Sequence, residues 1–303
     1  MVRKISFLAL FLGSCFMLFG QEIITDFTAP EGAPIVTKGD FLIQGTVLVK
    51  YIGSGGHVEI TSDLELTEIG DNAFGNTQVE SVIIPEGLTK IGSYAFMNCK
   101  TLTGITIPNS VTSIGEGGFS RCSQLERIDI PARVASIGGN IFADCTGLTA
   151  ITVAQNNRNY SSIEGVLFNK NGTVLIAYPV GKEDAAYTVP SQVNRIEQSA
   201  FSNGFHLVEV IFPEGLTAIG DRAFYNCNSL TSITIPLSLA TIGDRAFYRC
   251  SNLAALTLPA GLKRIGNYAF AECTSLDTIL LSRTTEYGTD PFRKVPGTLP
   301  YIP

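Results

Sequence analysis

One stretch decides the fold: residues 91–113 read IGSYAFMNCKTLTGITIPNSVTS, and the same pattern begins again at Ile114-Gly115. The opening Ile-Gly-x-x-Ala-Phe recurs along the chain, and the Cys-x-x-Leu-x-x-Ile-x-Ile-Pro that follows it recurs at the same offset. Self-similarity at a fixed period of this length is the signature of a repeat protein.

Nine copies of the opening motif can be aligned. They start at Ile69, Ile91, Ile114, Ile137, Ile196, Ile219, Ile242, Ile265 and, in degenerate form, Tyr287. Successive starts lie 23 residues apart, except for 22 at the first and last intervals and one jump of 59. Because one such unit cannot close a core alone, the sequence predicts stacked coils that share a continuous core.

Each part of the unit has an expected role. Leu-x-x-Ile-x-Ile predicts a short strand in which Ile105 and Ile107 point into the core and Thr106 points out. Pro108 removes a ladder donor and should end the strand. The glycine of Ile-Gly is expected to permit a tight bend. Ala-Phe is expected to return the chain in a short helical turn, with the phenylalanine inside.

The unit resembles the bacterial BspA-like, Treponema-type leucine-rich repeat, with which it shares the C-x-x-L-x-x-I-x-I-P and I-G-x-x-A-F signatures. The resemblance covers about Phe41 to Phe292. It implies an α/β solenoid, a leucine-rich-repeat superhelix with a parallel concave sheet and short helical turns on the convex side. It also implies secreted or surface proteins, some of them adhesins, and provides no catalytic residue to carry over.

The jump of 59 residues holds 36 more than one repeat, and its content predicts a β-hairpin insertion. Residues 163–168 and 173–178 flank Asn171-Gly172, a strong hairpin-turn signal, and 185–189 predicts a third strand. Thr173–Tyr178 stands 18 residues before Ile196, as the similar Thr46–Tyr51 stands 18 before Ile69. We therefore expect two arrays, each led by a hairpin-like cap; a coincidental insertion is the alternative.

The expected divisions follow from these landmarks. They are a signal peptide over 1–20, a linker and cap hairpin over 21–68, a first array over 69–153, a hairpin insertion over 154–195, and a second array with a C-terminal cap over 196–303.

The N-terminus predicts export. Arg3 and Lys4 precede an apolar run over 5–19, and Gly20 offers a cleavage site before polar residues. A lipobox ending at Cys15 is the rival, with lipid attachment at that cysteine, and a short buried helix is the structural alternative. The expected location is extracellular, cell-surface or periplasmic, with membrane contact only if Cys15 is lipidated.

The charge balance disfavours nucleic acid as a partner. The chain has 303 residues and a net charge of −6, which becomes −8 without Arg3 and Lys4 (19 basic against 27 acidic residues). No basic run is present, so neither nucleic acid nor an anionic lipid surface is expected to bind.

No residue cluster predicts catalysis, a cofactor or a metal site. Six cysteines occupy one inward position of the repeat, at Cys99, Cys122, Cys145, Cys227, Cys250 and Cys273. Their side chains should run parallel, about a strand spacing apart, which is too far for a relaxed disulfide. A disulfide framework or a metal column is the alternative. His57 and His206 are the only histidines. Asp71, Asp221 and Asp244 are interpreted as caps of the helical turns, with a calcium column as the alternative.

Two surfaces are candidates for partner binding. On the strand face they are Thr106, Glu126, Arg127, Asp129, Thr152, Glu209, Thr234 and Thr257; the row of threonines could equally reflect β-propensity and cross-strand pairing. On the turn side they are Arg222, Tyr225, Arg245 and Tyr248, types enriched at interface hot spots; recent duplication is the alternative there.

The favoured function is a non-catalytic, adhesin-like protein that binds a protein or glycan of unknown identity. The alternative is a structural or assembly component of the cell envelope without a soluble ligand.

Overall fold

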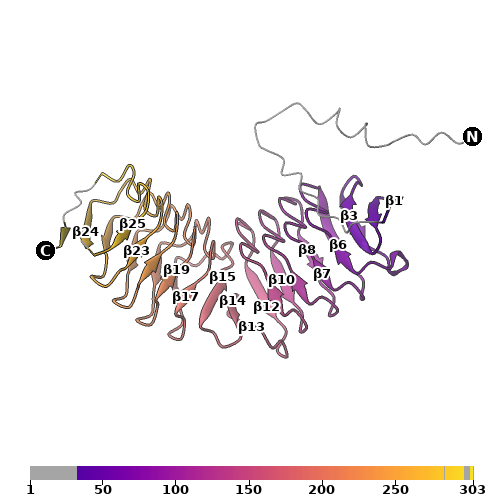
Figure 1. The fold of residues 1–303 in the computed structure, drawn as a ribbon, viewed down its shortest axis with the longest axis horizontal. Coiled ribbons are helices and arrows are strands. Elements are labelled where there is room, and N and C mark those ends of the chain that lie inside the picture. The colour runs from indigo at the N-terminus through magenta and orange to yellow at the C-terminus, as the bar shows by residue number, and fades with distance from the viewer. Residues whose placement is uncertain (1–32, 283, 297–300, 303) are drawn as a thin grey trace, which may run out of the picture.

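Each repeat contributes two short strands, and the two kinds of strand stack into separate parallel rows. The computed structural model describes residues 33–282, 284–296 and 301–302. Its coils follow a curved path from β1 to the strands near the C-terminus, with β13 at the bend (Figure 1). The leader and lipobox predictions, on residues 1–20, lie outside the described residues.

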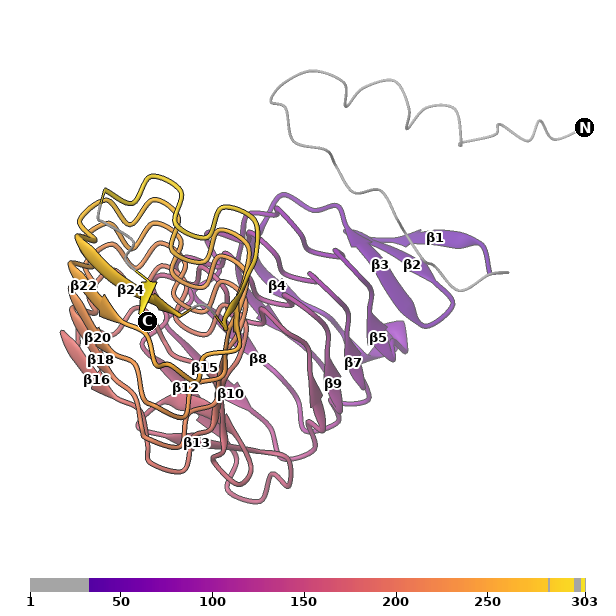
Figure 2. The same cartoon turned by 60° about the vertical axis from the view of Figure 1, so that its left-hand side comes forward.

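The first row is formed by the Ile-x-Ile strands, and its outward side is called the strand face below. Its strands pair in parallel, with Ile83 opposite Thr106 and Asp129 opposite Thr152. The later strands lie side by side (Figure 2). The members are β4 (Gly56–Glu59), β6 (Val79–Ile83), β8 (Gly104–Thr106), β10 (Arg127–Ile130), β12 (Ala150–Val153), β16 (Ala186–Thr188), β18 (Glu209–Ile211), β20 (Ser232–Thr234), β22 (Ala255–Thr257), β24 (Thr278–Ser282) and β26 (Tyr301–Ile302). The parallel pairing predicted for these strands is confirmed, and its hydrogen bonds divide the row into four sheets, β4-β6-β8, β10-β12, β16-β18-β20 and β22-β24-β26.

The second row lies at the Ile-Gly pairs and was not predicted. Each full coil adds only two residues, as in β5 (Glu68–Ile69), β7 (Lys90–Ile91), β9 (Ser113–Ile114) and β11 (Ser136–Ile137). After the mid-chain insertion the row continues with β17 (Arg195–Ile196), β19 (Ala218–Ile219), β21 (Thr241–Ile242), β23 (Arg264–Ile265) and β25 (Glu286–Tyr287).

Antiparallel hairpins lead both arrays, as predicted. The first is β1 (Ile35–Lys38), β2 (Phe41–Gln44) and β3 (Val47–Tyr51), and the second is β13 (Tyr160–Ile163), β14 (Val166–Asn169) and β15 (Val174–Ala177). Leu48 of β3 pairs with Ile69, and Leu175 of β15 pairs with Ile196. The two hairpins therefore enter their arrays in the same register.

The short helical turns predicted at Ala-Phe are wrong. Among the described residues the one helical element is the 3-10 turn η2 (Ser62–Leu64). Two residues of each turn have left-handed backbone, for example Asn72 (φ 55°) and Asn76 (φ 64°) around Phe74. A left-handed residue interrupts a right-handed helix. The N–H groups of the turn therefore alternate between two kinds of hydrogen bond. Gly75 N donates to Asn72 O within the turn, and Phe74 N donates to Ala95 O of the next coil.

The glycine of Ile-Gly serves close approach of coils instead of a bend. Its φ is not left-handed, and a Cβ on Gly243 would stand 2.6 Å from the backbone nitrogen of Asp221 in the preceding coil. Real Cβ atoms do not come so close. In the first coil after the mid-chain hairpin, Glu197 occupies the position of this glycine. The neighbour that precedes this coil is strand β15 of the hairpin and not a full coil. The glycine is thus required where one full coil lies on another.

Stacked rings fill the interior of each array. Tyr51 stacks on Phe74 at 5.1 Å, and the column continues through Phe96 and Phe119 to Phe142. A second column starts with Tyr178 on Phe201 at 5.0 Å and runs to Phe292. The buried residues correspondingly form two clusters that meet at β14 and β15.

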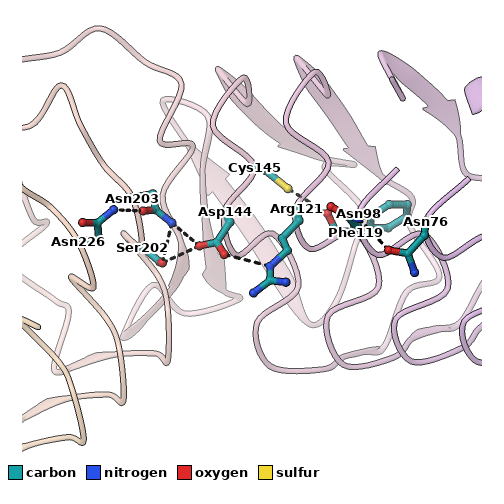
Figure 3. Close-up of polar contacts among 9 residues, drawn as sticks. All are labelled: Asn76, Asn98, Phe119, Arg121, Asp144, Cys145, Ser202, Asn203 and Asn226. Carbon is teal, nitrogen blue, oxygen red and sulfur yellow. Dashed lines mark hydrogen bonds and ion pairs between the residues drawn. The ribbon is translucent and has the colours of Figure 1, made fainter. Parts of the chain in front are cut away.

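Side chains bridge the two arrays on the turn side (Figure 3). Asp144, from the last coil of the first array, accepts hydrogen bonds from Ser202 Oγ at 2.8 Å and from Asn203 Nδ2. Its other oxygen lies 3.5 Å from Arg121 Nε. Asn226 then donates to Asn203 at 2.6 Å, which continues the polar column into the second array. No helix among the described residues could span a membrane.

Candidate binding surface

The outward residues of the strand face form two columns. One runs through His57, Ser81, Gly104, Arg127, Ala150, Ala186, Glu209, Ser232 and Ala255, and the other through Glu59, Ile83, Thr106, Asp129, Thr152, Thr188, Ile211, Thr234 and Thr257. Alternation along each strand buries the residue between the columns and turns the columns to solvent. Thr152 is half-buried, and the other predicted strand-face residues are exposed.

The two halves of this face differ in charge. Over the first array, Glu59, Glu80, Glu126 and Asp129 are exposed, and Arg127 is the permanent cation among them. Over the second array the columns hold one charged residue, Glu209, beside Ala, Ser, Thr and Ile, and exposed Asp277 occupies the repeat position that Glu80 and Glu126 have in the first array. The strand face is therefore more strongly charged over the first array than over the second.

An open groove of about 460 Å³ crosses the charged half, over β6, β8 and β10. Its centre is Gly104, between Ser81 and the coil of Arg127, and a Cβ built there would meet no atom within 4 Å. Ile83, 52% exposed, and half-buried Ile105 provide apolar surface in the groove. The missing side chain at Gly104 leaves the floor open.

Some polar groups of the groove already have partners. Thr152 donates a hydrogen bond to Asp129 across the strands. His57 Nδ1 lies 2.8 Å from Ser81 Oγ, and its Nε2 lies 3.5 Å from Glu80. His57 therefore belongs to the edge of this surface.

The structure brings the predicted turn-side tyrosines together. Tyr225 stacks on Tyr248 with ring centres 5.3 Å apart. Arg245 lies over the ring of Tyr268, 5.5 Å from its centre, and has left-handed backbone, as Arg222 does. Spacing alone predicted the tyrosine column; it missed the place of Tyr268.

A charged cluster next to these rings was also missed. Glu272 accepts from Arg249 Nε at 3.1 Å, from Lys294 Nζ at 3.2 Å and from Tyr248 Oη at 3.0 Å. These hydrogen bonds, led by that of Arg249, lower the pKa of Glu272 to about 2. These three donors occupy the Glu272 carboxylate, which makes the cluster a support of the last coils and a weaker candidate for a ligand site.

The six repeat cysteines are free, buried thiols. Each donates its S–H to the carbonyl of a phenylalanine in the preceding coil, as Cys145 does to Phe119 O at 3.0 Å (Figure 3). Burial raises the pKa of Cys145, Cys227 and Cys273 to about 12. Reactive thiols need a lowered pKa and exposure, so these cysteines fill and tie the interior. The sequence predicted the inward column and missed its hydrogen bonds.

The predicted aspartate caps act between coils and not within a helical turn. Asp71 Oδ1 accepts from Ser93 N at 2.7 Å, and Asp221 Oδ1 from Asp244 N at 2.8 Å. Asp244 in turn accepts from Asn267 N at 2.8 Å. Within the described residues no group of three or more His, Cys, Asp or Glu could hold a metal ion. His206 is exposed and lies outside the groove.

These features define a class: a parallel-stranded, leucine-rich-repeat solenoid with an exposed strand face. The family model described as the BspA type leucine rich repeat region matches residues 65–178 and 185–296 in six copies. The chain belongs to this family.

Solved structures share the fold. The pneumococcal vaccine antigen PcpA is 22% identical, with a TM-score of 0.72 over 87% of this chain and 86% of that one. A leucine rich cell surface protein from Faecalibacterium prausnitzii A2-165 is 26% identical, with a TM-score of 0.57 over 85% and 91%. No curated protein sequence matches the chain.

Proposed function

We propose that this protein is a non-catalytic, adhesin-like binding protein of the cell surface that recognises a protein or glycan through its strand face. One observation carries the proposal: two columns of outward side chains run along each array, and a groove opens on the strand face over the first array. An extended row of exposed residues on a rigid repeat scaffold suits a large ligand better than a small one.

Two further points support the proposal. The similar structure from Faecalibacterium prausnitzii is a cell surface protein, and the N-terminal segment of this chain has the pattern of an export signal. The intact mass of the mature protein tests export: removal of residues 1–20 leaves Gln21 first, whereas a lipoprotein begins at an acylated Cys15. A mature protein that keeps residues 1–20 contradicts the proposal.

Binding is tested with a panel of extracellular-matrix proteins and glycans. Thr106→Arg combined with Thr234→Arg places a long cationic side chain on each half of the strand face and should weaken capture about tenfold or more, since a bulky or like-charged group in an interface costs several kcal/mol. The matched control is Thr89→Arg with Thr217→Arg, two exposed threonines outside the strand face. Circular dichroism confirms that both variants fold. If the strand-face variant captures its ligand like the wild type, this face is not the binding site.

A further inference from the structure

The groove over the first array has a charge that selects its partner. Its rim and neighbourhood hold four exposed carboxylates, those of Glu59, Glu80, Glu126 and Asp129, against the guanidinium of Arg127. Glu126 and Asp129 are both among the residues that line the groove. This surface therefore attracts a cationic group and repels an anionic one.

The shape of the groove adds a second requirement. Gly104 leaves space above the sheet, and Ile83 offers an apolar surface that is 52% exposed beside it. Lysine and arginine side chains match this combination, because an aliphatic stem of three or four carbons carries their charged head. A free metal ion has no such stem and would leave the apolar surface unused.

We propose that this groove docks a segment of a partner protein that presents a lysine or arginine side chain. The stem lies over Gly104 against Ile83, and the carboxylates of Glu126 and Asp129 hold the cationic head. The proposal rests on the proposed function, since it names the partner of the same strand face. It also gives the two halves of the face different tasks: the charged half selects the partner, and the nearly uncharged half has no such preference.

The probe is a short fluorescent peptide of alternating lysine and serine, compared with its glutamate counterpart by fluorescence polarisation. The wild type should bind the lysine peptide and not the glutamate peptide, and binding should weaken as salt rises, because exposed charges are screened beyond about 10 Å at 0.1 M salt.

Three variants separate the groove from general acidity. Gly104→Val fills the hollow without changing the charge, and it suits a strand position with no atom within 4 Å of the new Cβ. It should weaken lysine-peptide binding about tenfold, as should Glu126→Gln with Asp129→Asn. The matched control, Glu183→Gln with Glu214→Gln, removes two exposed carboxylates of the chain outside the groove and should bind like the wild type.

The outcomes decide between the two proposals. The groove proposal is overturned if the glutamate peptide binds as well, if the control loses as much affinity as the groove variants, or if Gly104→Val has no effect. If Gly104→Val blocks the lysine peptide while the strand-face threonine variant keeps every ligand of the panel, the groove stands and the proposed function fails. If the panel ligand is lost with the threonine variant and Gly104→Val binds the lysine peptide like the wild type, the groove proposal fails and the proposed function stands.

Discussion

Gly243→Ala should remove much of the stability that close coil stacking gives the second array. The added Cβ would stand 2.6 Å from Asp221 N and 2.7 Å from the carbonyl carbon of Gly220. Both are backbone atoms of the preceding coil, so neither can rotate away. The two coils must separate, or the turn must tilt.

The cost has two parts. Forcing an extra carbon into a packed interior costs about 1–3 kcal/mol. Separation also stretches the bonds from Gly243 N to Ile219 O (2.9 Å) and from Asp244 N to Asp221 Oδ1 (2.8 Å), each worth about 0.5–1.5 kcal/mol. Alanine also lowers the conformational entropy of the unfolded chain, which offsets about 0.4–1 kcal/mol of this loss in stability. The net loss should be about 3 kcal/mol of an unfolding free energy that is usually about 5–15 kcal/mol.

Gly261→Ala is the matched control. Its Cβ would approach nothing closer than Leu237 O at 3.9 Å, and Gly261 does not have left-handed backbone. The same substitution there should stabilise by about 0.4–1 kcal/mol. Urea unfolding measures both, followed by far-ultraviolet circular dichroism and tyrosine fluorescence, since the chain has no tryptophan. A Gly243→Ala variant within about 0.5 kcal/mol of the wild type would refute the role assigned to this glycine.

Three further outcomes are expected. Asp144→Ala removes the hydrogen-bond acceptor of Ser202, which is 5% exposed, and should lower the free energy of unfolding by about 1–3 kcal/mol. An unchanged urea midpoint would show that the bridge between the arrays does not stabilise the fold. In the folded protein the pKa of Glu272 is lowered to about 2, so its contribution to stability is complete above the usual glutamate pKa of about 4.3 and is lost as the pH falls towards 2. Glu272→Gln should remove this contribution. If stability falls with pH in the same way in the variant and the wild type, the prediction is wrong. Cys250 and the other buried thiols should react with a thiol reagent only after unfolding, since burial raises the pKa of Cys250; rapid labelling of the native protein would contradict that.

The sequence predicts the parts of this fold that repeat. The period places the coils, and alternation in Ile105-Thr106-Ile107 is sufficient to assign the outward residue of a strand. The hairpins are predictable because Asn171-Gly172 marks a turn and because Thr46–Tyr51 and Thr173–Tyr178 occupy the same place before their arrays.

The errors arise where one coil meets the next. Ala-Phe looks helical when its turn is considered alone, but the turn gives half of its N–H groups to the neighbouring coil. One signal was available: Asn76, Asn98, Asn203 and Asn226 all occupy the residue before the cysteine position, and asparagine is the side chain that best tolerates left-handed backbone. The glycine of Ile-Gly carries no such signal, because its contact with the preceding coil exists only after stacking.

The candidate surface was predictable as a set of columns and not as a groove. Thr106, Arg127 and Asp129 were assigned to the strand face from spacing alone, but the hollow depends on what Gly104 lacks. A repeat of this kind fixes its phenylalanine and most of its glycine and cysteine positions, which leaves sequence differences between coils to the outward positions, the strand-face columns among them. Any selectivity of the strand face must come from those columns. A single missing side chain, at Gly104, is therefore enough to make one coil of the first array unlike the others.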